Sequence, residues 1–212
     1  MVPMTRKSDS PLRALEPDEA KTQLRATIRK DRQQRSERRL HEAALALRDH
    51  VLSLPSIQDA RCVSVYASRP HEPGTGPLIE ALHQRGVRVL IPLLGDGLQR
   101  GWGEYRGYED LVERAPGRPP EPSGEFLGSA ALVDADVVVV PALAVDTAGT
   151  RLGQGGGWYD RALVDAHEGA PVIALTFASE VRDAEKDPLP RERHDIGVDM
   201  VITPEGASPL PA

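Results

Sequence analysis

The sequence has very little cysteine and few aromatic residues, and both shortages restrict what the chain can be. Among its 212 residues Cys62 is the one cysteine, and Phe, Trp and Tyr together make up 4%. A single thiol cannot close an internal disulfide or build a thiolate metal cluster, so we expect a reducing compartment and a buried, unreactive Cys62. Leu, Val, Ile and Ala must therefore supply most of the core.

The sequence also lacks long apolar runs and an excess of basic residues. No apolar run approaches the roughly 20 residues that a membrane helix needs, and the N-terminus lacks the apolar segment of a signal peptide. The net charge of −6 argues against a general nucleic-acid-binding protein, whose domain is usually strongly basic. We expect a cytoplasmic monomer with no membrane and no nucleic-acid partner.

The apolar periodicity predicts one α/β unit. Residues 1–17 mix Pro, Ser and charge and are expected to be a mobile N-terminal tail, residues 18–205 a single catalytic domain, and residues 206–212 an irregular C-terminal tail. Helices are predicted over 18–35, 36–54, 77–85 and from 158 to about 167, and strands over 62–67, 87–91, 102–105, 137–140, 171–177 and 200–203. Pro141 is expected to end the ladder of the fourth of these strands.

The order of these elements predicts the fold class and the edge at which a ligand binds. Strand–helix–strand units predict a single three-layer α/β domain, Rossmann-like, with a mostly parallel central sheet flanked by helices. Ligands of such sheets bind at the carboxyl ends of the strands, and Glu72 lies just past one such end. Residues 126–132 are expected to pack against the core.

A glycine-rich loop follows the four consecutive valines at 137–140. It contains Gly149, Gly153, Gly155, Gly156 and Gly157, and is framed by Arg151, Asp160 and Arg161. Glycines let the backbone turn through positive φ and approach a ligand closely. Backbone amides that open a helix, with an arginine beside them, are suited to phosphate. The first hypothesis is therefore a phosphate-binding loop.

Spacing alone does not decide between an anion-binding loop and a merely flexible one. The glycines match neither a Walker P-loop nor a dinucleotide fingerprint, and the sequence has no G-x-S-x-G elbow for a serine nucleophile. Lys21, Arg25 and Arg29 are four residues apart and share one face of the first helix. That face is either a solvated surface or a set of cations that reaches a phosphate-bearing ligand.

The longer string around the loop is more specific than its glycines. Residues 141–161 read P-A-L-A-V-D-T-A-G-T-R-L-G-Q-G-G-G-W-Y-D-R, which resembles the signature of the 5-formyltetrahydrofolate cyclo-ligases, also called methenyltetrahydrofolate synthetases. Four other segments resemble the family in the same order: residues 21–25, 66–75, 117–122 and 194–203. The resemblance covers about residues 18–205.

The resemblance implies an activity and a set of site residues. Enzymes of this family use ATP and Mg²⁺ to cyclise 5-formyltetrahydrofolate to 5,10-methenyltetrahydrofolate, with release of ADP and phosphate. The implied ATP-binding residues are Lys21, Arg25, Arg151, Gly153, Gln154, Gly155, Gly156, Gly157, Trp158, Tyr159 and Asp160. Arg151 and Asp160 are implied to be catalytic, and Asp160 and Asp195 to bind Mg²⁺. Glu72 is implied to hydrogen-bond the pterin-like ring, and Trp158 to stack on folate or ATP.

Each of these residues also has a purely structural explanation. Asp160 could cap a helix, Asp195 could pair with Arg193, Glu72 could be an ordinary loop carboxylate, and Trp158 a core residue. Two other functions stay open. One is a non-catalytic or divergent member of the fold that senses a nucleotide or phosphorylated metabolite, and the other is an RNA-binding protein that uses the helix from Lys21 to Arg39.

Overall fold

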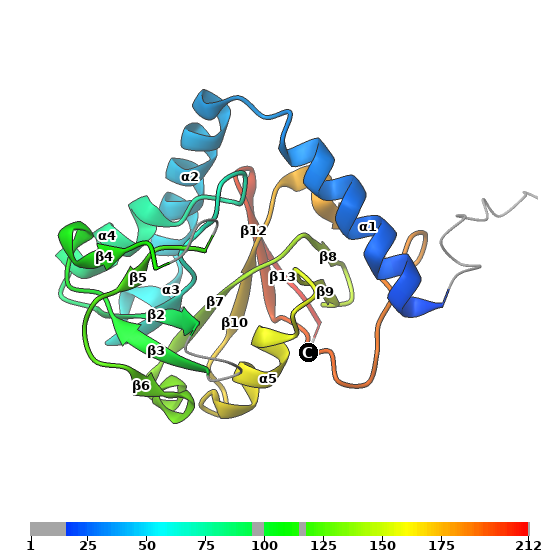
Figure 1. Ribbon diagram of the computed structural model, residues 1–212. Helices are drawn as coiled ribbons and strands as arrows, with labels where there is room; N and C mark the ends of the chain where they lie inside the picture. The colour runs from blue at the N-terminus through cyan, green and yellow to red at the C-terminus, as the bar shows by residue number, and fades with distance from the viewer. Residues whose placement is uncertain (1–15, 95–99, 115–117, 212) are drawn as a thin grey trace, which may run out of the picture.

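A central sheet of eight strands organises the computed structural model, which describes residues 16–94, 100–114 and 118–211 (Figure 1). Its order is β13-β12-β10-β7-β1-β2-β3-β6. The strands are β1 (Cys62–Val65), β2 (Arg88–Leu94), β3 (Arg100–Glu104), β6 (Leu127–Gly128), β7 (Val137–Pro141), β10 (Val172–Leu175), β12 (Met200–Thr203) and β13 (Gly206–Pro209). The five strands from β12 to β2 pair in parallel, while β13, β3 and β6 join antiparallel at the edges. The predicted mostly parallel α/β sheet is confirmed.

The valines of β7 lie at the centre of this sheet and contribute to both of its faces. Val137 and Val139 belong to one apolar cluster, whereas Val138 and Val140 belong to the other. All four side chains are fully buried. Successive side chains of a strand point to opposite faces, so a strand that is covered on both faces reads as an uninterrupted apolar run.

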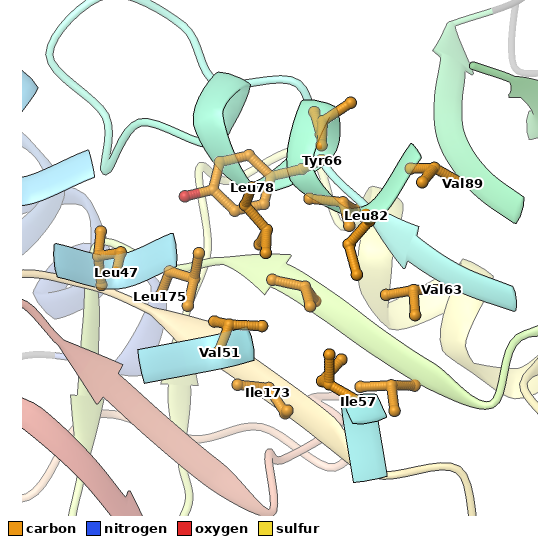
Figure 2. Packing of buried hydrophobic residues seen from close by; sticks show 14 of the residues in the cluster. Leu47, Val51, Ile57, Val63, Tyr66, Leu78, Leu82, Val89, Ile173 and Leu175 are labelled. Atoms are coloured by element: carbon orange, nitrogen blue, oxygen red, sulfur yellow. The ribbon is translucent and has the colours of Figure 1, made fainter. Parts of the chain in front are cut away.

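Helices cover both faces of the sheet and give the domain three layers. On one face lie α2 (Glu37–Leu52), α3 (Pro55–Gln58) and α4 (Gly76–Gln84). Figure 2 shows Leu47 of α2 and Leu78 of α4 in the same apolar cluster as Val63 of the sheet. On the other face lie α5 (Trp158–Ala162) and the short 3₁₀ turns η3 (Ser129–Asp134) and η4 (Leu163–Asp165), whose buried residues include Leu132 and Ala162.

The first helix, α1 (Pro17–Arg32), packs on a second, smaller sheet (Figure 1). That sheet consists of β8 (Ala144–Asp146), β9 (Arg151–Leu152) and β11 (Val181–Arg182). Leu24 and Ile28 of α1 form an apolar cluster with Ala144 and Leu152. This contact fixes the remaining faces of α1 relative to the glycine-rich loop, which begins at β9. The other elements are η2 (Tyr108–Asp110), β4 (Leu111–Val112), β5 (Glu121–Pro122) and η5 (Ala178–Glu180).

The helix after the glycine-rich loop is shorter than the sequence predicts. We expected it to reach about His167, but α5 ends at Ala162 and continues as the 3₁₀ turn η4. Ala162 and Leu163 are buried against the sheet, whereas Val164 is 71% exposed. Ala166 also packs against the same apolar cluster, so the chain keeps its apolar contacts while its hydrogen bonding changes from α-helical to 3₁₀.

The C-terminal segment differs from expectation, whereas Pro141 agrees with it. The segment after Glu205, expected to be irregular, forms β13, which pairs antiparallel with β12. The ladder of β7 ends at Pro141, which is the last residue of the strand and lies opposite Leu175. A proline at a strand end loses one donor but keeps its carbonyl as an acceptor. Leu132 is buried as expected of residues 126–132, but Phe126 is 44% exposed. Most of the expected N-terminal tail, and Gly117, lie outside the described residues.

Candidate active site

A cavity of about 580 Å³ lies between α1, the glycine-rich loop and the segment 192–195. All of the residues that the sequence analysis assigns to ATP line it. Its cationic side chains are Lys21, Arg25, Arg69, Arg151 and Arg161, and its anionic ones are Asp18, Asp160, Glu192 and Asp195. No helix among the described residues has the length and apolarity to span a membrane.

The glycine-rich loop adopts backbone angles that favour glycine. Gly155 has φ of 103° and Gly157, the residue before α5, has φ of 57°. A side chain at Gly155 would also meet the Arg25 guanidinium, with its Cβ 3.3 Å from Cζ. Arg25 Nε donates to the Gly153 carbonyl oxygen at 3.0 Å. The loop and α1 therefore meet closely. The positive φ favours glycine at 155, and any larger residue there would press on the Arg25 side chain.

Arg151 is held at the carboxyl end of β7 by a buried ion pair. Its Nη2 lies 2.9 Å from Asp160 Oδ1, its Nη1 lies 3.5 Å from the Pro141 carbonyl oxygen, and the residue is only 6% exposed. The Ile196 amide also donates to Asp160 Oδ1, at 3.2 Å. Asp160 therefore does not cap α5. Its carboxylate instead orients a guanidinium at the edge where parallel sheets bind ligands.

Lys21 crosses the cavity to the segment 192–195. Its Nζ lies 2.7 Å from Glu192 Oε2 and 2.5 Å from Asp195 Oδ2. Burial lowers the pKa of Lys21, but the hydrogen bonds to the two carboxylates outweigh that effect, so the pKa is raised. Burial likewise raises the pKa of Asp195, yet the hydrogen bond from Lys21 leaves it below its usual value. Both groups are therefore charged at neutral pH, and Asp195 pairs with Lys21 rather than with Arg193.

The grouping of possible metal ligands differs from the predicted pair. Glu192, His194 and Asp195 each offer a ligand atom, and these atoms lie within 4.8 Å of one another. Asp160 is not part of this group, but its Oδ1 accepts a hydrogen bond from the amide of Ile196, the residue after Asp195. One oxygen of each predicted ligand, Asp160 Oδ2 and Asp195 Oδ1, accepts no hydrogen bond from any described residue. Such carboxylate oxygens are suitable ligands for a hard cation.

Glu72 lies outside the main cavity but is tied to the glycine-rich loop. Its Oε1 accepts a hydrogen bond from Gln154 Nε2 at 2.7 Å, and its Oε2 accepts one from the Arg69 amide at 2.8 Å. Glu72 lines two smaller cavities, of about 210 and 90 Å³. Both of these share Gln154 and Arg69 with the main cavity. Glu72 therefore borders two cavities that share wall residues with the main one.

Three aromatic rings pack edge to face where α5 begins. Trp158 packs edge-on against Trp102 and Tyr159, with ring centroids 5.2 and 4.8 Å apart. Trp158 Nε1 and the Tyr159 hydroxyl are buried without a hydrogen-bond partner among the described residues. Burial raises the pKa of Tyr159 far above its usual value, so its hydroxyl stays protonated and can donate. Trp158 thus joins the core on one side and lines the main cavity on the other.

Several residues of the site were not assigned by sequence reasoning. Arg29 Nη2 donates to the backbone carbonyl oxygen of Gln154 at 2.8 Å and to its side-chain oxygen at 3.0 Å. The four-residue spacing from Arg25 is the sequence feature that could have assigned Arg29 to the site. Arg69 and Glu192 gave no local signal, because their role depends on segments that meet only in the folded chain. The contacts of Lys21, Arg25 and Arg29 turn the basic face of α1 toward the loop, which argues against an RNA-binding surface.

Together, the fold and the site define a class: a parallel α/β protein with a charged, glycine-lined cavity at the carboxyl ends of its strands. The 5-formyltetrahydrofolate cyclo-ligase family model matches residues 17–204. The 5-formyltetrahydrofolate cyclo-ligase of Mycolicibacterium smegmatis is 38% identical over 193 residues, which cover 88% of this chain and 94% of that protein. The Escherichia coli protein of the same name is 34% identical over 158 residues, covering 73% and 84%. This chain therefore belongs to the 5-formyltetrahydrofolate cyclo-ligase family.

A solved structure agrees with this assignment. The 5,10-methenyltetrahydrofolate synthetase of Aquifex aeolicus superimposes with a TM-score of 0.75 at 26% identity, over 90% of this chain and 92% of that one. The family that the glycine-rich string predicts is confirmed.

Proposed function

We propose that this chain is an ATP-dependent ligase that cyclises 5-formyltetrahydrofolate to 5,10-methenyltetrahydrofolate, with release of ADP and phosphate. The observation that carries the proposal is the main cavity, in which Lys21 and Arg25 of α1 meet Arg151 and the glycine-rich loop, although α1 and the loop are far apart in sequence. Family membership supports the same activity. Every group assigned here belongs to one chain, so a monomer would suffice.

The triphosphate of ATP is expected to occupy the main cavity. Arg151 and Arg25 present guanidinium groups, which match the geometry of phosphate oxygens, and Lys21 adds a compact charge. Arg151 is oriented in advance by Asp160, so little reorganisation is needed when charge develops on the transferred phosphoryl group. The α5 helix has five residues and contributes little by its dipole; the arginines and the loop amides carry the binding.

The folate ring is expected to bind beside Glu72. The 90 Å³ cavity has apolar and aromatic walls, including Tyr66, Tyr159 and Pro141, and a carboxylate at Glu72. Flat apolar walls suit a bicyclic ring, and a carboxylate accepts hydrogen bonds from its amide and amino edge. The Tyr159 hydroxyl, which has no partner among the described residues, is available to donate to a bound substrate.

The chemistry needs positioning more than protein nucleophiles. The formyl oxygen attacks the γ-phosphorus of ATP. The bond between this phosphorus and the β,γ-bridging oxygen breaks, and ADP leaves with the electron pair. N10 then attacks the resulting imidoyl carbon, inorganic phosphate departs with the former formyl oxygen, and N10 loses its proton. Arg151 stabilises charge on the phosphoryl group, and the adjoining cavities hold the two substrates in contact.

The donor set also suits the magnesium that accompanies ATP. Asp160 Oδ2 and Asp195 Oδ1 are the carboxylate oxygens that would hold Mg²⁺, which neutralises charge on the β- and γ-phosphates when it is bound. Lys21 keeps the Asp195 carboxylate ionised and in place, since their ion pair lowers the pKa of Asp195.

Purified protein mixed with 5-formyltetrahydrofolate and MgATP tests the proposal, with the near-ultraviolet absorbance of the methenyl product and ADP release as readouts. We expect product that requires both ATP and Mg²⁺, and its loss in Asp160→Ala. Asp165→Asn, a nearby carboxylate outside the three cavities, is the matched control. Nucleotide binding without turnover in the wild-type protein would favour the sensor alternative instead.

A further inference from the structure

The cavity of about 210 Å³ next to Glu72 has both a cationic and an apolar side. Arg29 and Arg69 lie on it together with Pro70 and Leu143. Arg29 comes from α1 and Arg69 from the loop after β1, so two segments that are far apart in sequence each bring a guanidinium to the same opening. A ligand with an apolar body and an anionic end matches such a lining.

The positive charge of this cavity is only partly cancelled by its other side chains. Arg32 also lines it, but Arg32 is buried and pairs with Glu180 at 2.7 Å. Glu72 contributes one negative charge, against two from Arg29 and Arg69, and its oxygens accept hydrogen bonds from the neutral Gln154 side chain and the Arg69 amide. The guanidinium of Arg69 has no hydrogen-bond or ion-pair partner among the described residues, and Arg29 uses Nε and Nη2 on Gln154 but leaves Nη1 free.

This cavity adjoins the one expected to hold the folate ring. Both are lined by Glu72, Arg69 and Gln154. A folate consists of a flat bicyclic ring joined through an aminobenzoyl group to a glutamate, which carries two carboxylates. With its ring beside Glu72, its aminobenzoyl group would lie along Pro70 and Leu143 and its carboxylates near Arg29 and Arg69.

We propose that Arg29 and Arg69 bind the glutamate carboxylates of the folate substrate and so determine its specificity for the glutamate-bearing form. This inference rests on the proposed function. Guanidinium groups bind carboxylates through paired hydrogen bonds, and a carboxylate held by two arginines gains from both. The main cavity then serves the nucleotide, and the Arg29–Arg69 cavity serves the anionic end of the folate.

The test compares two substrates that differ only at that end: 5-formyltetrahydrofolate and 5-formyltetrahydropteroate, which lacks the glutamate. We expect Arg29→Gln and Arg69→Gln each to lower the preference for the glutamate-bearing substrate, measured as the ratio of the two kcat/KM values, by about fivefold to tenfold. Arg69→Lys should restore part of the preference because it keeps the charge. Lys30→Gln, an exposed neighbour on α1, is the matched control and should leave the ratio unchanged.

The outcomes separate this inference from the proposed function. Wild-type turnover with equal losses on both substrates in the arginine variants would overturn the assignment of the glutamate site alone. A rise in the KM for ATP with an unchanged substrate ratio would overturn it as well, because the cavity would then serve the nucleotide. Absence of turnover with either folate in the wild-type protein would overturn both proposals.

Discussion

The main cavity and the smallest of the three cavities, the one expected to hold the folate ring, adjoin each other but differ in their lining. The first, of about 580 Å³, is lined by five cations and four carboxylates, among which Lys21 pairs with Glu192 and Asp195, and Arg151 pairs with Asp160. The second, of about 90 Å³, has mainly apolar walls, with one carboxylate at Glu72 and one guanidinium at Arg69. Gln154 lines both and bonds to Glu72. The difference suggests that charge selects one substrate and shape the other.

Arg151→Ala should break this division most severely. We expect kcat/KM for ATP to fall by about 10²- to 10³-fold, because a preorganised cation aimed at the transferred group is lost. The loss also leaves Asp160 without its ion-pair partner. Steady-state kinetics with varied ATP measure the effect, and Arg151→Lys, which keeps the charge but not the paired donors, should fall between.

Glu72→Ala should have the next largest effect, and on the other substrate. We expect the KM for the folate to rise about tenfold to a hundredfold, because the hydrogen-bond acceptor for the ring edge is removed. Glu80→Gln, on α4 and outside the three cavities, is the matched control. Equal effects of Arg151→Ala and Glu72→Ala on both substrates would contradict separate nucleotide and folate sites.

Lys21→Met should reduce ATP use by about tenfold and also change the pH dependence of stability. The lowered pKa of Asp195 means that its ion pair stabilises the fold above the unfolded pKa of an aspartate, and that this contribution is lost as the pH falls through the folded pKa. The raised pKa of Lys21 places the alkaline loss above its ordinary value of 10.5.

Denaturant unfolding at several pH values measures this second effect. The free energy of unfolding should be lower in Lys21→Met by about 1 kcal/mol at pH 7, and the difference should shrink below about pH 4 as Asp195 is protonated. A difference that stayed constant down to pH 3 would exclude the ion pair as its cause.

Gln154→Ala should have the smallest effect on activity, and it tests most directly whether the nucleotide and folate cavities are independent. The Gln154 side chain links Glu72 to Arg29 and to the glycine-rich loop. We expect about a threefold rise in the KM of both substrates, because the shared wall loosens without loss of a charge. Isothermal titration of each ligand alone and with the other bound would reveal whether the two sites are coupled through this side chain.

Local patterns predicted the parts of the fold that depend on local physics. The valines of β7, the apolar spacing in α2 and the glycines before Trp158 each reflect a requirement set by residues close in sequence. Each lies in the element where it was expected. The predictions failed where a long-range contact decided the outcome. β13 exists because β12 offers an open edge with which it can pair.

The sequence by itself determined the family, the mostly parallel α/β sheet and the string of residues around the glycine-rich loop. The tertiary structure alone decided which charged groups meet: Lys21 with Asp195, 174 residues away, and Gln154 with Glu72, 82 residues away. The physical reason is that periodicity and turn preference act over a few residues, whereas ion pairing depends on how α1 docks on β8 and β9.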